Sequence, residues 1–128
     1  MQLLLDTHAL LWHLAGDPRL PPRARQAIDD PAHVAFTSAA SAWEIATKTR
    51  LGKLPGGMLA TDFVATARAE GFRILPVGAQ DVQDAGNLPG PHGDPFDRML
   101  AAQALRRDLT LVSGDALLDQ FGVTRLWA

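Results

Sequence analysis

The sequence is organised around the start of one helix, Gly93-Asp94-Pro95-Phe96-Asp97-Arg98-Met99-Leu100. Asp94 is suited to cap the first free backbone N–H groups, and Pro95 is suited to the first helical position. Asp97 follows in the first turn, where two carboxylates three residues apart lie on the same side of a helix. If one carboxylate serves as the cap, the other is free to belong to a site whose remaining members lie far away in the sequence.

The composition predicts one globular domain spanning residues 1–128. The chain is long enough to bury a core, with 47% hydrophobic and 20% charged residues, and its net charge of −2 argues against a strongly basic nucleic-acid-binding coat. The absence of cysteine excludes disulfides, thiolate metal sites and cysteine nucleophiles, and it fits a cytoplasmic protein. We find no signal peptide and no apolar run of the roughly 18 residues that a membrane span needs.

Short apolar runs alternate with helical segments along the chain. We expect strands at residues 2–5, 34–37, 72–77, 109–112 and 123–127. We expect helices at residues 8–14, 23–30, 39–51, 58–70, 79–85, 95–107 and 116–121. This alternation predicts parallel strands joined by right-handed crossovers, and therefore a three-layer α/β/α sandwich with a central, mainly parallel sheet. The breaker-rich loop 86–93 is the best candidate for a mobile segment.

Four acidic residues lie near transitions from a strand to a helix: Asp6, Glu44, Asp97 and Asp115. Because ligands of such sheets bind at the carboxyl ends of the strands, we expect these side chains to line one pocket. Two like charges about 5 Å apart repel by roughly 3 kcal/mol at an effective dielectric of about 20. We therefore expect a bound cation to offset the repulsion within the cluster. Mg²⁺ or Mn²⁺ prefers carboxylate oxygens, and this donor set suits phosphodiester chemistry.

Each of the four acids also has a structural interpretation. Asp6 and Asp115 are suited to cap the helices that follow them, and Asp97 is suited to complement a helix dipole. Glu44 fits both a capping box and an i,i+4 ion pair with Lys48. The case for a site therefore depends on the four residues together.

Other polar and apolar residues have two interpretations each. His8 and His92 lie near the rim of the expected pocket but show no metal-ligand spacing, so a role for them is the less favoured interpretation. Lys48 and Arg98 are candidates to contact a phosphate backbone, or they belong to a solvated face. A hydrophobic partner groove is the alternative to a core position for five residues: Leu11, Trp12, Trp43, Leu51 and Leu54.

Four segments carry a family resemblance when they are taken together. They are Leu3-Leu4-Leu5-Asp6-Thr7-His8-Ala9-Leu10-Leu11-Trp12, Ser41-Ala42-Trp43-Glu44-Ile45-Ala46, His92-Gly93-Asp94-Pro95-Phe96-Asp97-Arg98-Met99-Leu100-Ala101-Ala102-Gln103-Ala104 and Val112-Ser113-Gly114-Asp115. They occur in order and cover essentially the whole chain. Together they resemble the PIN-domain family, and they look most like its VapC-type toxins.

The resemblance implies a Mg²⁺- or Mn²⁺-dependent endoribonuclease that hydrolyses RNA phosphodiester bonds with metal-activated water. Such a protein is the toxin of a bacterial or archaeal type II toxin–antitoxin system. By the family pattern, the acidic quartet of catalytic metal ligands would be Asp6, Glu44, Asp97 and Asp115.

The resemblance also implies further contacts and partners. Thr7 and Ser113 match small hydroxyl positions that often contact metal, water or phosphate. The family usually forms homodimers. A small VapB-like antitoxin lays its C-terminal arm across the active-site groove of the toxin.

Three other interpretations fit the sequence less well. A haloacid-dehalogenase-like phosphatase normally has a second Asp two residues after the first, and here that position is His8. A receiver domain has paired acids after the first strand and a lysine near its end, but no lysine follows Lys53. A non-catalytic PIN-fold binding module remains open, although the intact acidic quartet disfavours it.

Overall fold

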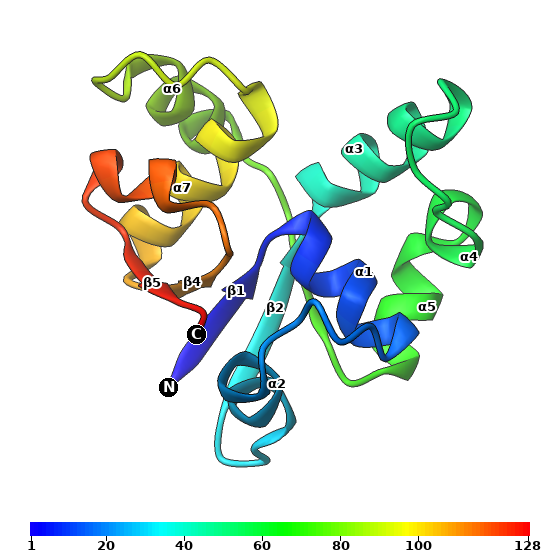
Figure 1. Ribbon diagram of the computed structural model, residues 1–128. Helices are drawn as coiled ribbons and strands as arrows, with labels where there is room; N and C mark the ends of the chain where they lie inside the picture. Colours follow the sequence, from blue (N-terminus) through cyan, green and yellow to red (C-terminus); the bar gives the residue numbers. More distant parts are fainter.

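A five-stranded parallel sheet forms the centre of the protein (Figure 1), which is described over residues 1–128 by a computed structural model. Its strands are β1 (Gln2–Leu5), β2 (Val34–Ser38), β3 (Arg73–Leu75), β4 (Thr110–Val112) and β5 (Thr124–Leu126). They lie in the order β3-β2-β1-β4-β5, and every neighbouring pair is parallel. β1 is central and its three leucines are fully buried, as expected of a strand covered on both faces.

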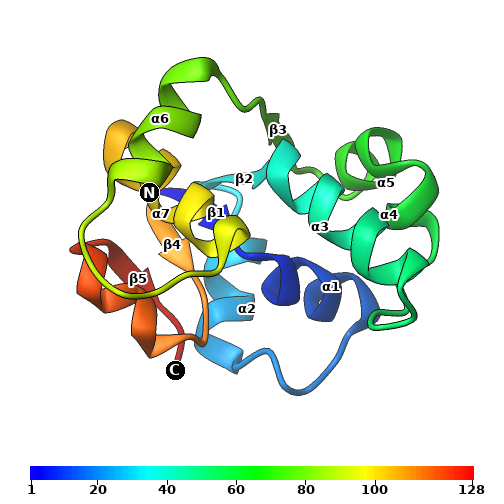
Figure 2. The ribbon, with the colours of Figure 1, turned by 90° about the horizontal axis from the view of Figure 1, so that it is seen from above.

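Helices cover both faces of the sheet, so the predicted three-layer α/β/α fold is confirmed (Figure 2). They are α1 (Thr7–Ala15), α2 (Pro22–Asp29), α3 (Ala39–Arg50), α4 (Met58–Thr61), α5 (Phe63–Ala69), α6 (Ala79–Asn87) and α7 (Pro95–Arg107), with the 3₁₀ helix η1 (Ala116–Phe121). Side chains alternate between the faces of β1. Leu3 and Leu5 therefore face a core that includes Leu10 and Phe63, while Leu4 faces one that includes Leu100.

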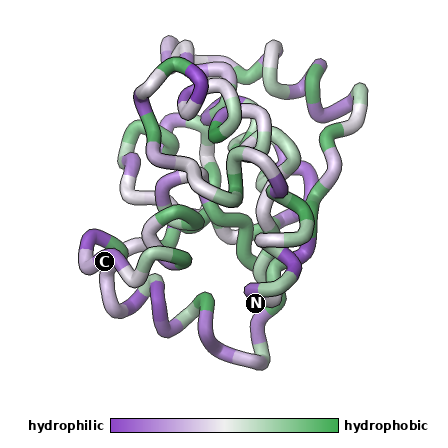
Figure 3. The backbone as a smooth tube through the Cα atoms, turned by 90° about the vertical axis from the view of Figure 1, so that its right-hand side faces the viewer, coloured by the Kyte–Doolittle hydropathy of each residue, from purple (hydrophilic) through white to green (hydrophobic).

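The peripheral helices alternate between hydrophobic and hydrophilic residues along the chain (Figure 3). That alternation is typical of helices with one buried and one solvated face. All of the helices are too short or too polar to cross a lipid bilayer.

Several details of the predicted elements are wrong, and β3 and β5 are shorter than expected. The segment 58–70 is not one helix, because Asp62 adopts φ −144° and ψ 66° and separates α4 from α5. Threonine and aspartate are both weak helix formers, which places the interruption at Thr61-Asp62. The helix that carries Glu44 does not begin with a capping box at 41–44, since Ser38 is its cap and accepts a hydrogen bond from the Ala40 N–H (3.0 Å).

The loop after α6 is tied to the first turn of α7 by one side chain. The Arg98 guanidinium donates hydrogen bonds to the backbone carbonyls of Ala85 (3.0 Å), Leu88, Gly90 (3.5 Å) and His92 (2.7 Å). One planar cation therefore serves four backbone carbonyls, of which those of Ala85, Leu88 and His92 belong to buried or half-buried residues. The loop predicted to be mobile therefore has a defined anchor.

Candidate metal centre

Asp6 lies directly after the central strand β1 and caps α1. Its Oδ1 accepts a hydrogen bond from the Ala9 N–H (2.8 Å), which confirms the prediction that Asp6 caps the helix that follows it. Burial raises the pKa of Asp6 above its usual value, while hydrogen bonds from Ser113 and Ala9 oppose the rise. The charge of Glu44 raises the pKa further, so the two acids share one electrostatic environment.

Glu44 is buried on α3, with only 5% of its surface exposed. The Thr7 hydroxyl donates a hydrogen bond to Oε1, and the Lys48 ammonium pairs with Oε2, which confirms the predicted i,i+4 pair. Burial by itself lowers the pKa of Lys48, but the hydrogen bond and charge of Glu44, with two further acids nearby, outweigh burial and raise it. Both oxygens of the glutamate are therefore held in place, as a buried charge requires.

Asp94 and Asp97 divide the roles at the start of α7. Asp94 is the cap, because its Oδ1 accepts hydrogen bonds from the N–H groups of Phe96 (2.9 Å) and Asp97 (3.0 Å). The carboxylate of Asp97 is left free to point away from the helix. Burial, with help from the charge of Asp94, raises the pKa of Asp97 to about 6, against the opposing influence of His92.

Asp115 follows β4 and caps η1. Its Oδ1 accepts from the Leu117 N–H (3.0 Å), and its own N–H donates to Ser113 Oγ (3.1 Å). A Cβ at Gly114 would lie 2.8 Å from the ring of Trp127, so only glycine lets the chain pass there without a shift. The Asp115 side chain is 38% exposed, more than that of Asp97 (24%) or Glu44 (6%).

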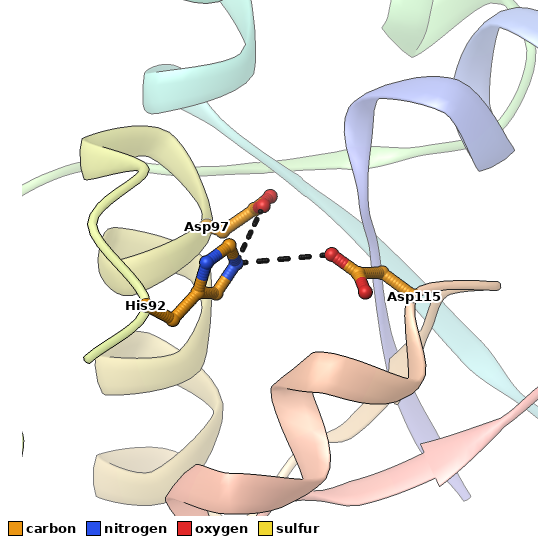
Figure 4. A group of neighbouring side chains, drawn as sticks. All are labelled: His92, Asp97 and Asp115. Atoms are coloured by element: carbon orange, nitrogen blue, oxygen red, sulfur yellow. Dashed lines mark hydrogen bonds and ion pairs between the residues drawn. The ribbon is translucent and has the colours of Figure 1, made fainter. Parts of the chain in front are cut away.

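Asp97 and Asp115 meet around an imidazole that comes from the loop before α7 (Figure 4). His92 Nε2 lies 3.0 Å from Asp97 Oδ2 and 3.7 Å from Asp115 Oδ2. One ligand atom from each of these three residues lies within 4.8 Å of the other two. Sequence reasoning gave His92 no favoured role, and its position five residues before Asp97, just ahead of the cap, is the one signal that could have placed it.

The quartet is brought to one edge of the sheet as two linked pairs. Asp97 and Asp115 form the pair around His92, while Asp6 and Glu44 are linked through the adjacent Thr7. Asp6 and Asp115 also line a common hollow of about 500 Å³. Its other lining residues are His8, Trp12, Arg19, Gly114 and Trp127.

The residues predicted to contact phosphate have protein partners in this structure. Thr7 and Lys48 bind Glu44, and Ser113 bonds Asp6 and the backbone of Asp115. Arg98 is occupied by the carbonyl of Ala85 in α6 and by three carbonyls of the loop that follows. These contacts favour a role in positioning the acids and the loop.

The five apolar residues predicted as a partner groove do not share one surface. Trp43 is 65% exposed and lines an apolar hollow of about 430 Å³ formed by α3, α6 and α7, together with Val82, Phe96 and Met99. Trp12 lines the acidic hollow instead, and Leu11 packs against the core. Leu51 is exposed and Leu54 is half-buried.

The donor set fits a hard divalent cation. It offers carboxylate oxygens from separate elements, at the carboxyl edge of a parallel sheet, with one imidazole nitrogen among them. The raised pKa values of Asp6 and Asp97 indicate that their negative charges are unfavourable without a cation. The residues with ligand atoms close enough to share one ion are His92, Asp97 and Asp115, and Asp6 lines a hollow together with Asp115.

The fold and site define an α/β domain with an acidic pocket at the carboxyl edge of its sheet. The chain belongs to the PIN domain family, whose model matches residues 3–123. No curated protein sequence matches it.

Solved toxin–antitoxin structures share this fold. VapC20 of Mycobacterium tuberculosis, described as a sarcin–ricin loop cleaving toxin, has a TM-score of 0.71 at 19% identity, over 98% of this chain and 99% of that one. VapBC2 of Rickettsia felis, bound to a promoter DNA fragment, has a TM-score of 0.70 at 14% identity over 100% of both chains. VapBC-1 of nontypeable Haemophilus influenzae has a TM-score of 0.66 at 17% identity, over 98% and 97%. At these identities the likeness is one of fold.

Proposed function

We propose that this protein is a metal-dependent endoribonuclease and the toxin of a type II toxin–antitoxin system. The observation that carries the proposal is a set of neighbouring acids at one edge of the sheet: Asp97 and Asp115 lie around His92, and Asp115 lines a hollow with Asp6. Membership of the PIN domain family supports a nuclease, and the toxin–antitoxin structures of the same fold support a toxin.

The acidic quartet would hold Mg²⁺ or Mn²⁺, with Asp6, Asp97 and Asp115 nearest the solvent and Glu44 behind them. When bound, the ion would supply an activated water and would neutralise charge on the phosphate. The chain contributes preorganisation: Thr7 and Lys48 orient Glu44, and the Asp94 cap fixes the turn that carries Asp97. A preorganised site costs little reorganisation when the substrate binds.

The proposed partners are an RNA substrate, a small VapB-like antitoxin and a second copy of the chain. Several structures of this fold are VapBC or FitAB complexes. The apolar hollow that exposes Trp43 lies beside Phe96, in the same first turn of α7 as Asp97. An antitoxin arm bound there would lie close to the acidic site. We expect the protein to act in the cytoplasm.

The test is metal-dependent RNA cleavage by the purified chain, with Mg²⁺, with Mn²⁺ and with a chelator. Asp6→Asn should lower cleavage by at least about 100-fold, because it removes a metal ligand. Asparagine is as good a helix cap as aspartate, so the α1 cap survives the substitution. Asp62→Asn is the matched control, since Asp62 is exposed and caps nothing through its side chain.

The same experiment separates the rival functions. A phosphomonoester assayed in parallel should not be hydrolysed. Its hydrolysis without RNA cleavage would indicate a phosphatase. Equal RNA cleavage by the wild-type protein and Asp6→Asn would rule out the proposed site, and no cleavage under any condition would leave a binding module as the better description.

A further inference from the structure

The geometry points to His92 as a direct ligand of the metal, in a mixed nitrogen and oxygen set with Asp97 and Asp115 that favours Mn²⁺ over Mg²⁺. This inference rests on the proposed function, and it deepens that function by adding a residue outside the acidic quartet and by selecting the ion.

The distances around His92 suit a shared ion. Ligand atoms that bind an octahedral ion at about 2.1 Å lie about 3 Å apart when they are adjacent and about 4 Å apart when they are opposite. His92 Nε2 lies 3.0 Å from one aspartate oxygen and 3.7 Å from the other, within that interval. The nitrogen faces both carboxylates at once (Figure 4), whereas a simple ion pair needs only one.

The imidazole is held in this position by the surrounding structure. Its ring stacks on Phe121 with centroids 6.0 Å apart and planes at 22°, and the His92 backbone N–H donates to Gln120 Oε1 (3.3 Å). Arg98 binds the His92 carbonyl (2.7 Å). The His92 side chain is consequently only 14% exposed. Ligands fixed by such second contacts bind metals more tightly than free ones.

A nitrogen ligand changes the choice of ion. Mg²⁺ is bound almost entirely through oxygen, whereas imidazole binds transition-metal ions well. A site of carboxylates alone discriminates weakly between Mg²⁺ and Mn²⁺. Adding His92 should strengthen Mn²⁺ binding more than Mg²⁺ binding, so the ratio of the two affinities reports on this residue.

The test compares the wild-type chain with His92→Gln in calorimetric titrations with MnCl₂ and with MgCl₂. The variant should lose Mn²⁺ affinity by about tenfold or more and Mg²⁺ affinity by much less. His33→Gln is the matched control, because His33 contacts the Ala27 carbonyl (2.8 Å) and Asp30 (3.6 Å), neither of which belongs to the proposed metal site. An unchanged ratio of Mn²⁺ to Mg²⁺ affinity in His92→Gln would overturn the inference.

A second measurement needs no variant. Pulsed electron paramagnetic resonance of Mn²⁺ bound to the wild-type chain should show coupling to a ¹⁴N nucleus, and its absence would refute His92 as a ligand. Nitrogen coupling without RNA cleavage would support the ligand and refute the nuclease. Mn²⁺-dependent cleavage without nitrogen coupling would support the nuclease and refute His92 as a ligand. Failure to bind either ion at millimolar concentration would refute both.

Discussion

Asp97 shows how a single carboxylate can make the metal-free fold less stable. The folded state raises its pKa from 3.8 to about 6, mainly by burial. Between these two values the folded chain holds a proton that the unfolded chain has released. The contribution of Asp97 to the free energy of unfolding is therefore most favourable to the folded state below about pH 4. This contribution declines as the pH rises to about 6.

Asp97→Asn should consequently stabilise the metal-free protein at neutral pH. One pKa unit corresponds to about 1.4 kcal/mol, so the gain at pH 7 should be on the order of 1 to 3 kcal/mol, while the gain should vanish near pH 3. Urea unfolding in the presence of chelator at both pH values measures it. A variant that is less stable than the wild type at pH 7 would show that the buried charge is not costly.

The structural roles of the residues at the start of α7 were predictable because they depend only on the neighbouring sequence. The sequence Asp94-Pro95 specifies a cap and a first helical position without reference to the rest of the fold. The division of roles between Asp94 and Asp97 followed from that, and the structure confirms the cap. His92 was not predictable in the same way, because its position depends on contacts with Phe121 and Arg98 that are distant along the chain or across a loop.

The elements differ in how far sequence specifies them. Apolar runs and helical spacing predicted every strand and the order of the helices, because burial in a two-sided sheet leaves that pattern. The ends of β3 and β5, and the break at Asp62, were missed because pairing partners and local backbone angles decide them. The path of the loop between α6 and α7 was missed for a similar reason: it is set by one side chain of the following helix.

Arg98→Met should release that loop. The substitution removes the donor for four carbonyls and keeps much of the aliphatic side chain, so the His92 N–H, which donates to Gln120 Oε1, should exchange hydrogen at least about tenfold faster. Hydrogen exchange followed by mass spectrometry measures this.

Arg106→Met, which breaks an exposed ion pair with Asp84, is the matched control and should leave the loop unchanged. If exchange in the loop is as slow in Arg98→Met as in the control, then Phe121 and Gln120 hold the segment without the arginine.

At the scale of the whole molecule, the site exists only when the sheet is assembled. β1, β2 and β4 are neighbours in the sheet but lie far apart in the sequence, and their carboxyl ends place Asp6, Glu44 and Asp115 at one edge. The unfolded chain has no such cluster. Metal binding is therefore linked to folding, and an ion at 100 times its dissociation constant should stabilise the fold by about 2.7 kcal/mol.

Mg²⁺ or Mn²⁺ should accordingly raise the melting temperature of the wild-type protein by about 10 °C, given about 4 °C per kcal/mol for a domain of this size. Differential scanning calorimetry with and without chelator measures the rise. Asp97→Asn should begin from a higher melting temperature in chelator and gain little from metal, because the same carboxylate that destabilises the metal-free fold is a ligand. Asp94→Asn keeps the cap and should respond like the wild type. If Asp94→Asn lost the response and Asp97→Asn kept it, the two carboxylates of this helix turn would have the opposite roles.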